Sequence, residues 1–451
     1  MKLQSFGAAD GVTGSRHLVT LGETPLLLDC GLFQGWKLHR ERNWAPLPEA
    51  LRAAQAVVLS HAHLDHSGWL PALVKQGWHG PILATPATCA LAEVLLLDSA
   101  HLQEEDARRA NRYGYSRHVK ALPLYTRADA RRALALLEPL PFGRARRVGD
   151  TTVRFTRAGH LLGAASVLLE GQGQRLLYSG DLGRQNDLLM APPEAPPDAD
   201  VVMIESTYGN RTHPADDPME RLGAIVRDTV ARGGSVLMPA FAVGRTQALL
   251  LVLQRLKAAG EIPQDLPIVV DSPMAVEATA LYRRHAADLK VPRREMTRLV
   301  DGVRLVTAVE QSMRLSRSRW PMVLISASGM ATGGRVLHHL KAMAPDPRHH
   351  IVFAGFQVGG SRGARLVAGE REVKVHGEMV PVRASVSSLE GSSGHADAGE
   401  LLDWLGRLQR APSLVRVVHG EPDASDTLRA RIQQRFGWRV QVAGYGEAVT
   451  A

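Results

Sequence analysis

The stretch that decides the fold is Ser60-His61-Ala62-His63-Leu64-Asp65-His66-Ser67-Gly68. It directly follows the apolar run Ala56-Val57-Val58-Leu59, so the pattern predicts a buried strand that ends where four potential ligands begin. Imidazole and carboxylate groups together suit zinc. Because alternate side chains of an extended segment point to the same side, we expect His61, His63 and Asp65 to converge while His66 faces a second ion. The stretch therefore predicts a site for two metal ions.

Composition is that of a globular protein. A chain of 451 residues with 45% hydrophobic content is long enough for about two to three domains with a substantial core. The first residues, Met1 to Gly7, lack a secretory apolar stretch, and no run approaches the roughly 20 apolar residues that span a membrane. We therefore expect a cytoplasmic protein with no membrane partner. Only Cys30 and Cys89 occur, outside any CxxC pair, which favours reduced thiols over disulfides.

The net charge of +9 favours a polyanionic partner. Basic residues crowd into 108–157, and Tyr113, Tyr115 and Tyr125 stand among them. Two interpretations stay open for this segment, a nucleic-acid surface or a solvated helical face rich in arginine.

Five further predicted strands also end at a polar residue. The five residues are Asp29 after Leu26-Leu27-Leu28, His160 after 151–156, Asp181 after 175–178, Glu205 after 201–204 and His419 after 414–418. In layered α/β folds, the loops at strand ends build sites on a rigid scaffold, so we expect all six ends to share one rim. Asp181 suits a bridging role between two ions, and His419 completes the ligand count.

The segment between Glu205 and His419 has a different pattern, in which buried strands alternate with helices. The predicted strands are 235–238, 267–271, 322–325 and 350–353, and Pro239 to Gln247 opens a helix. This alternation predicts a doubly wound parallel sheet, inserted into the first domain.

His395 lies in Ser393-Gly394-His395-Ala396-Asp397, directly before a predicted helix that Asp397 caps. Backbone N–H groups and an imidazole at a helix N-terminus attract phosphate. Glycine-rich loops at 326–334, which include Ser328 and Gly329, and at 359–363 could admit a phosphodiester, although glycine turns also simply join strands to helices.

These residues resemble the metallo-β-lactamase superfamily and, within it, the β-CASP branch of nucleases. Asp29, His61-Ala62-His63-Leu64-Asp65-His66, His160 and Asp181 are similar to the four superfamily motifs. The three additional motifs of the branch resemble Glu205 in Glu-Ser-Thr-Tyr-Gly, His395 in Ser-Gly-His-Ala-Asp and His419 in His-Gly-Glu. Some archaeal relatives carry an N-terminal RNA-binding extension, which we do not expect here because the first motif is reached at Asp29.

The resemblance implies an α/β fold, an αββα metallo-β-lactamase sandwich with an inserted β-CASP domain that caps the metal cleft. We expect the sandwich to comprise residues 1–206 and a C-terminal return at 379–451, with the inserted domain at 207–378.

The resemblance also implies a zinc-dependent ribonuclease that cleaves single-stranded RNA, as an endonuclease, a 5′–3′ exonuclease or both. Our hypothesis assigns one Zn²⁺ to His61, His63 and His160, a second to Asp65, His66 and His419, and the bridge to Asp181. Asp65 counts both as a ligand and as a catalytic group. His395 is the expected proton donor, oriented by Glu205, and Asp29 is expected to hold a ligand or the water. Arg245, Ser328, Gly329, Ser393 and Gly394 are expected to bind phosphates.

The alternatives are a DNA-acting nuclease of the same family, a hydrolase of a small phosphoester or acyl substrate, and a non-catalytic RNA-binding scaffold. A homodimer is left open. A complete set of ligands disfavours the scaffold, whereas RNA over DNA rests on the resemblance, since no residue pattern identifies a contact to a 2′-hydroxyl.

Overall fold

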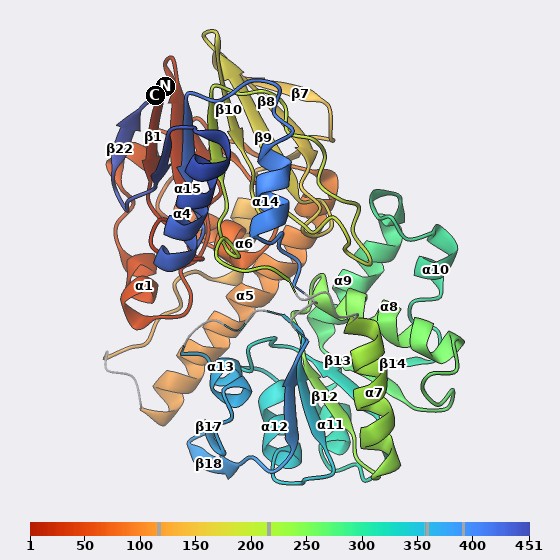
Figure 1. Cartoon of the computed structure of the whole chain (residues 1–451). Coiled ribbons are helices and arrows are strands. Elements are labelled where there is room, and N and C mark those ends of the chain that lie inside the picture. The colour runs from red at the N-terminus through yellow and green to blue at the C-terminus, as the bar shows by residue number, and fades with distance from the viewer. Residues whose placement is uncertain (115–118, 214–217, 356, 358–359, 390–392) are drawn as a thin grey trace. The chain divides into compact units, whose positions relative to one another are not determined.

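The computed structural model of the chain describes residues 1–114, 119–213, 218–355, 357, 360–389 and 393–451 (Figure 1). They form two compact units. Unit 1 comprises Met1–Asp187, Ala191–Thr212 and His395–Ala451, and unit 2 comprises Leu188–Met190 and His213–Gly394. Unit 2 is thus inserted into the sequence of unit 1. The boundaries predicted from the sequence stay a prediction.

Unit 1 contains two seven-stranded sheets. The first has the order β22-β1-β2-β3-β4-β5-β6 and the second the order β21-β20-β11-β10-β9-β8-β7. The strands of the first sheet are β1 (Lys2–Ser5), β2 (His17–Leu21), β3 (Thr24–Leu28), β4 (Ala56–Val58), β5 (Ile82–Ala84), β6 (Leu137–Pro139) and β22 (Ala448–Thr450). Those of the second are β7 (Ala145–Val148), β8 (Thr151–Arg157), β9 (Ala165–Gly171), β10 (Gln174–Tyr178), β11 (Val201–Ile204), β20 (Leu414–Val417) and β21 (Val440–Val442).

Each sheet is antiparallel in one part and parallel in the other. In the first sheet the pairs from β3 to β6 are parallel, and in the second the pairs from β10 to β21 are parallel. The two sheets share one core, in which Val19 and Leu26 of the first cluster with Phe155 and Leu169 of the second, all fully buried. This burial of two apolar sheet faces against each other is the main stabilising contribution to unit 1.

Helices cover the outer faces of both sheets, which makes the unit an αββα sandwich. They are α1 (Lys37–Glu41), the 3₁₀ turn η1 (Arg42–Trp44), α2 (Glu49–Arg52), α3 (Leu64–Ser67), α4 (Leu70–Lys75), α5 (Pro86–Tyr113), α6 (Arg127–Leu134), α14 (Ala398–Leu405) and α15 (Pro422–Phe436). α5 packs against β6 and α6, whereas α15 packs against β20 and β21. Thr85 caps α5, because its side chain accepts the backbone N–H of Thr88.

Unit 2 is built on a six-stranded, wholly parallel sheet with the order β14-β13-β15-β12-β16-β19. Its strands are β12 (Val236–Pro239), β13 (Ile268–Asp271), β14 (Val303–Val306), β15 (Val323–Ser326), β16 (His350–Phe353) and β19 (Ser385–Ser388), and β17 (Glu372–Val375) and β18 (Glu378–Pro381) form a hairpin. Its helices are α7 (Pro218–Ala231), α8 (Arg245–Ala258), α9 (Pro273–Arg284), η2 (Ala286–Asp288), α10 (Arg293–Thr297), α11 (Val309–Leu315), α12 (Val336–Met343) and α13 (Arg362–Val367). The predicted doubly wound sheet is confirmed.

A buried carboxylate links several helices of unit 2 to its sheet. Asp271 at the end of β13 is fully buried and accepts bonds from Arg335 (2.7 Å), His339 (2.6 Å) and Ser312 (2.5 Å). Burial raises the pKa of Asp271, but these hydrogen bonds, that of His339 first, outweigh it and hold the pKa below its ordinary value. His339 is thus structural.

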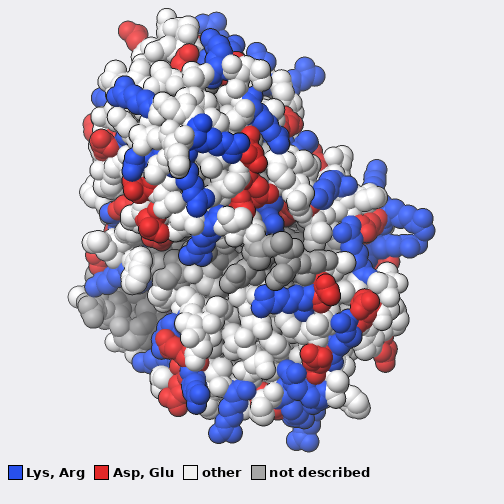
Figure 2. Space-filling model, in the orientation of Figure 1, with Lys and Arg blue, Asp and Glu red and all other residues white. Residues whose placement is uncertain are grey.

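The basic segment 108–157 is divided among several elements. It contains the end of α5 and all of α6, β6, β7 and β8, and Tyr125 within it is fully buried with its hydroxyl on Ser99. Tyr115 and Arg117 lie outside the described residues. Positive and negative side chains are interspersed over the visible face of unit 1 (Figure 2). The two interpretations of the basic segment stay open.

The two termini lie side by side, because Met1 and Ala451 exchange backbone hydrogen bonds and β22 pairs with β1 (Figure 1).

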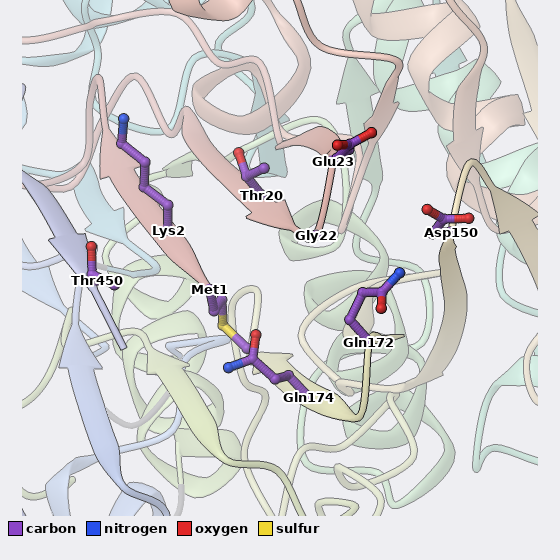
Figure 3. A pocket seen from close by; sticks show the side chains of 9 residues that line it. All are labelled: Met1, Lys2, Thr20, Gly22, Glu23, Asp150, Gln172, Gln174 and Thr450. Carbon is purple, nitrogen blue, oxygen red and sulfur yellow. The ribbon is translucent and has the colours of Figure 1, made fainter.

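Near the termini an open polar hollow of about 670 Å³ is lined by turn residues such as Gly22, Glu23 and Gln172 (Figure 3). It lies where β3 and β10 begin, whereas the predicted site residues follow the ends of these strands. None of the described helices is both long and apolar enough to cross a membrane.

Candidate metal centre

All six predicted strand ends deliver their residues to one rim of unit 1. Asp29 follows β3, His61 follows β4, His160 follows β8, Asp181 follows β10, Glu205 follows β11 and His419 follows β20. Asp29 and His419 are non-glycine residues with positive φ (58° and 53°), a conformation that strains an L-residue. The surrounding structure holds both in this conformation at the point where their side chains enter the cluster.

One group of ligands combines three imidazoles and a carboxylate. Nδ1 of His63 lies 3.2 Å from Nε2 of His61 and 3.2 Å from Nε2 of His160. Oδ2 of Asp181 lies 3.6 Å from Nε2 of His61 and 3.8 Å from Nε2 of His160. Two nitrogen ligands of one tetrahedral zinc, each about 2.05 Å from it, lie about 3.3 Å apart. The spacing of these four side chains therefore matches a single zinc ion.

A second group comprises Asp65, His66 and His419. The two Nε2 atoms of His66 and His419 lie 3.0 Å apart, and Oδ2 of Asp65 is 3.8 Å and 3.5 Å from them respectively. The expectation that Asp65 converges with His61 and His63 is wrong, because the chain is not extended beyond His63. The helix α3 begins at Leu64 and turns Asp65 to the side of His66.

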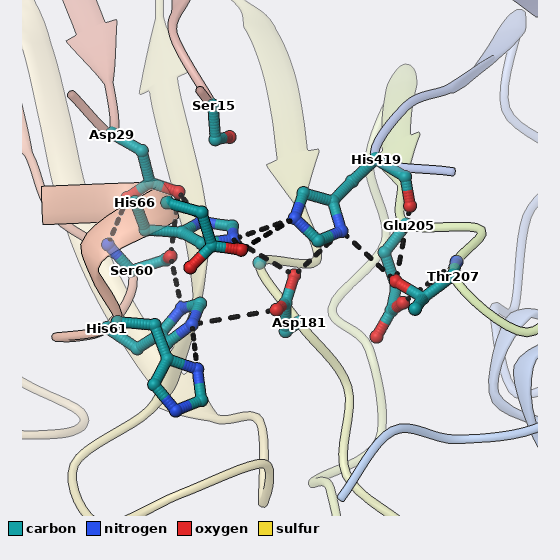
Figure 4. A network of polar contacts seen from close by, with 12 residues as sticks. Ser15, Asp29, Ser60, His61, His66, Asp181, Glu205, Thr207 and His419 are labelled. Carbon is teal, nitrogen blue, oxygen red and sulfur yellow. Dashed lines mark hydrogen bonds and ion pairs between the residues drawn. The ribbon is translucent and has the colours of Figure 1, made fainter. Parts of the chain in front are cut away.

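Asp181 lies between the two groups, with one oxygen toward each (Figure 4). Its Oδ1 is 3.4 Å from Nε2 of His66 and 3.5 Å from Nδ1 of His419. This buried oxygen accepts no hydrogen bond from the residues that the structure describes. A buried carboxylate oxygen without a donor is costly unless a cation satisfies it, so the donor set fits two metal ions bridged by Asp181.

Hydrogen bonds on the far side of the imidazoles orient three of the ligands. Nδ1 of His66 lies 2.7 Å from Asp29 Oδ2, and Nδ1 of His61 lies 3.0 Å from the hydroxyl of Ser60 (Figure 4). Nδ1 of His419 lies 3.1 Å from the hydroxyl of Thr207. When each Nδ1 carries the proton, each Nε2 presents its lone pair to the centre.

Asp29 is the hub of a buried polar network that sequence reasoning did not reveal. Its Oδ2 accepts the hydroxyls of Ser60 and Tyr178, each at 2.8 Å, in addition to His66, and its Oδ1 accepts the Ser60 N–H at 2.7 Å. The Tyr178 hydroxyl continues to Ser15 (3.2 Å), and Ser15 to Nε2 of His17 (3.2 Å). Burial lowers the pKa of His17 to about 3, so this imidazole is neutral. Tyr178 precedes Asp181 by three residues, but no local pattern indicates that its hydroxyl reaches Asp29.

Glu205 and His395 form a pair beside the metal ligands. Nδ1 of His395 lies 3.2 Å from Oε1 of Glu205, and 3.9 Å from Oδ2 of Asp181. Glu205 is fully buried and also accepts the backbone N–H groups of Leu182 (2.7 Å) and Thr207 (3.2 Å). His395 precedes α14, whose capping box joins Asp397 and Glu400 as predicted for the cap. Glu205 thus leaves Nε2 as the outward-facing nitrogen of His395.

Burial and neighbouring charges shift the pKa values of the metal-ligand candidates His63, Asp65 and His66. Burial lowers the pKa of His63 to about 4. Burial raises the pKa of Asp65, but the charges of His66 and His419 and a bond with His419 outweigh it and lower the pKa to about 2. Burial would likewise lower the pKa of His66, yet the surrounding carboxylates, Asp181 first, raise it well above its ordinary value. Such a field favours a cation at the centre.

Burial also lowers the pKa of His395, but the Glu205 carboxylate outweighs it and raises the pKa above its ordinary value. The protonated imidazole is therefore available near neutral pH.

The expected phosphate-binding residues belong to unit 2. Arg245 begins α8 after β12, and Ser328 and Gly329 follow the neighbouring strand β15. The two loops touch, because a Cβ added at Gly329 would lie 2.9 Å from the backbone nitrogen of Phe241. The helices after β12 and β15 lead to opposite sides of the sheet, so these loops flank a topological switch point, the usual ligand position in such sheets. Ser393 and Gly394 directly precede His395 in the chain, and Ser393 is buried.

The fold and the centre together define a metal-dependent hydrolase with an αββα sandwich. Sequence comparison agrees. Residues 10–235 match the metallo-β-lactamase superfamily, 246–366 the Beta-Casp domain, and 379–443 the Zn-dependent metallo-hydrolase RNA specificity domain. The chain belongs to the metallo-β-lactamase superfamily, and within it to the β-CASP branch.

Two named relatives and one solved structure are similar to the chain. It is 40% identical to Ribonuclease TTHA0252 of Thermus thermophilus over 100% of both chains. It is 30% identical to Transcription termination factor FttA of Methanosarcina mazei over 97% of this chain and 69% of that protein. A protein of unknown function from Enterococcus faecalis has the same fold, with a TM-score of 0.55 and 14% identity over 100% of this chain and 99% of that one.

Proposed function

We propose that this protein is a zinc-dependent ribonuclease that hydrolyses phosphodiester bonds of single-stranded RNA. The observation that carries the proposal is the arrangement of two ligand groups about Asp181 with the Glu205–His395 pair beside them. Unit 1 alone supplies all of these side chains. The 40% identity to a protein named a ribonuclease supports RNA as the substrate.

The centre would hold two Zn²⁺ ions, one at His61, His63 and His160, and the other at Asp65, His66 and His419. When bound, such ions supply a water that is activated near neutral pH and positive charge for the phosphoryl oxygens. Asp181, with one carboxylate oxygen toward each ligand group, would contribute to both. Asp29 keeps the imidazole of His66 in the tautomer that leaves Nε2 free, and Ser60 does the same for His61.

His395 would protonate the leaving oxygen. Its Nδ1 is held by Glu205, so Nε2 carries the proton that can be donated. The carboxylate keeps this imidazole protonated near neutral pH, the state that a general acid needs at the start of the reaction. Glu205 is thereby a positioning residue, and Asp65 takes part in catalysis as a ligand.

Phosphates of the RNA would bind backbone N–H groups and cations. We assign this role to Ser393 and Gly394 before His395, and to Arg245, Ser328 and Gly329 in the paired loops of unit 2. Glycine in such loops allows the backbone to approach a phosphate closely.

The substrate test uses zinc-loaded protein with single-stranded RNA and DNA of the same sequence, labelled at either end and bearing 5′ monophosphate or triphosphate. We expect cleavage of RNA, and the ladder of products distinguishes internal cuts from stepwise removal of 5′ nucleotides. Equal cleavage of DNA would favour the DNA-acting alternative. Binding of RNA without cleavage, at full zinc content, would favour the scaffold.

The roles within the site are tested by two substitutions. His395→Ala should retain two zinc ions by elemental analysis and lower cleavage by roughly 10²–10⁴-fold, the loss typical of a general acid. His63→Ala should release metal and abolish activity. The exposed His79 offers a control, since His79→Ala should change neither. Unchanged turnover in His395→Ala would refute its role as the general acid. Two bound zinc ions in His63→Ala would refute the assignment of His63 as a ligand.

The proposal also covers the domain boundaries, the cellular location and the oligomeric state. We place the domains at residues 1–206, 207–378 and 379–451, and the protein in the cytoplasm, where RNA is processed. A homodimer is proposed as the alternative to a monomer, to be decided by light scattering.

A further inference from the structure

Unit 2 carries a dense group of basic side chains outside the loops discussed above. Residues 283–298 include six basic and two acidic residues. The six are Arg283, Arg284, Lys290, Arg293, Arg294 and Arg298, and all of them are exposed. They lie at the end of α9, in the following loop and on α10, which packs against α9. We call them the α9–α10 basic surface. Figure 2 shows Lys and Arg atoms gathered over the part of unit 2 that Figure 1 labels α10.

The side chains of this surface lack acidic partners. No ion pair joins any of the six to a described residue, whereas arginines elsewhere are commonly paired, for example Arg42 with Asp10 (2.7 Å) and Arg348 with Asp346 (2.7 Å). The acid within α10 is already engaged, since Glu295 binds Arg255 of α8 at 2.8 Å. The other acid, Asp288, lies 3.9 Å from His285. The positive charge of the surface is therefore not neutralised by ion pairs with the residues that the structure describes.

The backbone beneath the surface is held in place by apolar anchors. Leu289, Val291 and Met296 are buried, and Leu289 forms a β-bridge with Met190. The N–H of Lys290 donates to the carbonyl of Leu189 at 3.2 Å. Burying alternate apolar residues directs the intervening cations outward. Like charges that are fixed close together repel each other within the screening length of about 10 Å at 0.1 M salt, and a polyanion relieves that repulsion.

We propose that the α9–α10 basic surface binds the phosphate backbone of single-stranded RNA, as a site additional to the phosphate-binding loops after β12 and β15. The inference rests on the proposed function, because that function identifies RNA as the polyanion. Five of the six cations are arginines, whose planar forks bind phosphate oxygens in pairs. No Phe, Tyr or Trp stands within 283–298 to stack on bases, and the imidazole of His285 lies 3.9 Å from Asp288. Binding is therefore independent of base sequence and increases with RNA length.

The test compares Arg293→Gln/Arg294→Gln/Arg298→Gln with a matched control, Arg144→Gln/Arg146→Gln/Arg147→Gln. Both variants remove three cations, but in the control Arg146 and Arg147 already have acidic partners, Glu138 and Asp150. Fluorescence anisotropy of a labelled 30-nucleotide RNA, with metal chelated to prevent cleavage, gives the affinity at several salt concentrations. Thermal unfolding confirms that both variants are folded.

The triple variant of Arg293, Arg294 and Arg298 is called the α10 variant. The salt slope is the change in log affinity per log salt concentration. We expect the α10 variant to reduce this slope by about 2, because each lost contact to a single strand removes about 0.7. Its affinity at 0.1 M salt should then fall about 100-fold, if the two salt lines meet near 1 M. The control should keep the wild-type slope. Hydrolysis of bis(p-nitrophenyl) phosphate, which is too small to reach a second site, should be unchanged in both. Equal affinity for RNAs of different sequence supports backbone recognition.

An α10 variant with the wild-type slope would overturn the inference. Loss of binding to polyglutamate with RNA affinity intact would also overturn it, in favour of an acidic protein partner. The two proposals fail separately. Wild-type protein that cleaves RNA while the α10 variant binds RNA normally refutes only the additional site. Wild-type protein that binds RNA through this surface but cleaves none refutes only the nuclease.

Discussion

Replacing Tyr178 by Phe removes one hydroxyl from the network that orients His66. Asp29 Oδ2 accepts three bonds, from Nδ1 of His66 (2.7 Å), from Ser60 (2.8 Å) and from Tyr178 (2.8 Å). All four residues are buried, so water cannot replace the lost donor. The substitution keeps the ring and therefore its packing in the core.

The expected effect is a weaker zinc site at Asp65, His66 and His419. A hydrogen bond to a buried charged group contributes about 1.5–3 kcal/mol. Since about 1.4 kcal/mol is tenfold in an equilibrium constant, transfer of this loss to metal binding weakens it roughly 10- to 100-fold. Titration with a chromophoric chelator should show one zinc ion bound that much more weakly, while the ion at His61, His63 and His160 keeps its affinity.

Tyr125→Phe is the matched control. Tyr125 is also fully buried and its hydroxyl is also hydrogen-bonded, to Ser99 at 2.8 Å, but Ser99 is not joined to the metal ligands as Asp29 is. It should lower the melting temperature without altering zinc affinity. Equal zinc affinity in Tyr178→Phe and the wild type would refute the view that the network positions His66, and so would equal weakening of both ions.

Three further results are expected. Gly31→Ala should abolish the zinc site of Asp65 and His66, because the new Cβ would lie 1.6 Å from the backbone oxygen of Asp65. Elemental analysis of bound zinc measures this loss. Gly333→Ala is the control, since its Cβ meets nothing within 4 Å and should leave the zinc content unchanged. Asp271→Asn should destabilise unit 2 by of the order of 3 kcal/mol, less what solvent recovers at the partly exposed Arg335. Because the pKa of Asp271 is held below its ordinary value of 3.8, its contribution is present above pH 3.8 and is lost as the pH falls through the folded-state pKa. Urea unfolding between pH 3 and 6 should therefore depend less on pH in Asp271→Asn, and an unchanged dependence would contradict the assignment. Chelation of zinc should lower the melting temperature, since zinc at 1,000 times its dissociation constant stabilises by about 4 kcal/mol, and a melting curve insensitive to chelator would argue against a resident metal.

Much of the site could be predicted because its residues stand at strand ends. Apolar runs such as Ala56-Val57-Val58-Leu59 predict buried strands, and the polar residue that follows each run is a local signal. The structure confirms that Asp29, His160, Asp181, Glu205 and His419 each follow a strand. The failure at Asp65 was also local, because the short helix α3 is too brief for a periodic pattern to reveal it.

The contacts on the far side of the ligands could not be predicted, because they join residues that are remote in the chain. Tyr178 and Asp29 are separated by 149 residues, and Thr207 and His419 by 212. The pairing of strands within the two sheets brings these residues together, and sheet order depends on the burial of whole faces, not on the residues at one strand end. The lack of acidic partners on the α9–α10 basic surface is likewise a property of the folded surface.

By itself, the sequence determined which chemistry is available, since the stretch from His61 to His66 with His160, Asp181 and His419 supplies the imidazoles and carboxylates of a metal centre. The division of these ligands into two groups was expected from the resemblance and not from their spacing, and only the tertiary structure brings the side chains together. It placed Asp65 with His66 and His419, set Asp181 between the two groups, and turned His395 toward Glu205. The physical reason is that residue type and local period act over a few residues, whereas the position of a side chain in the centre depends on two sheets that pack through one core.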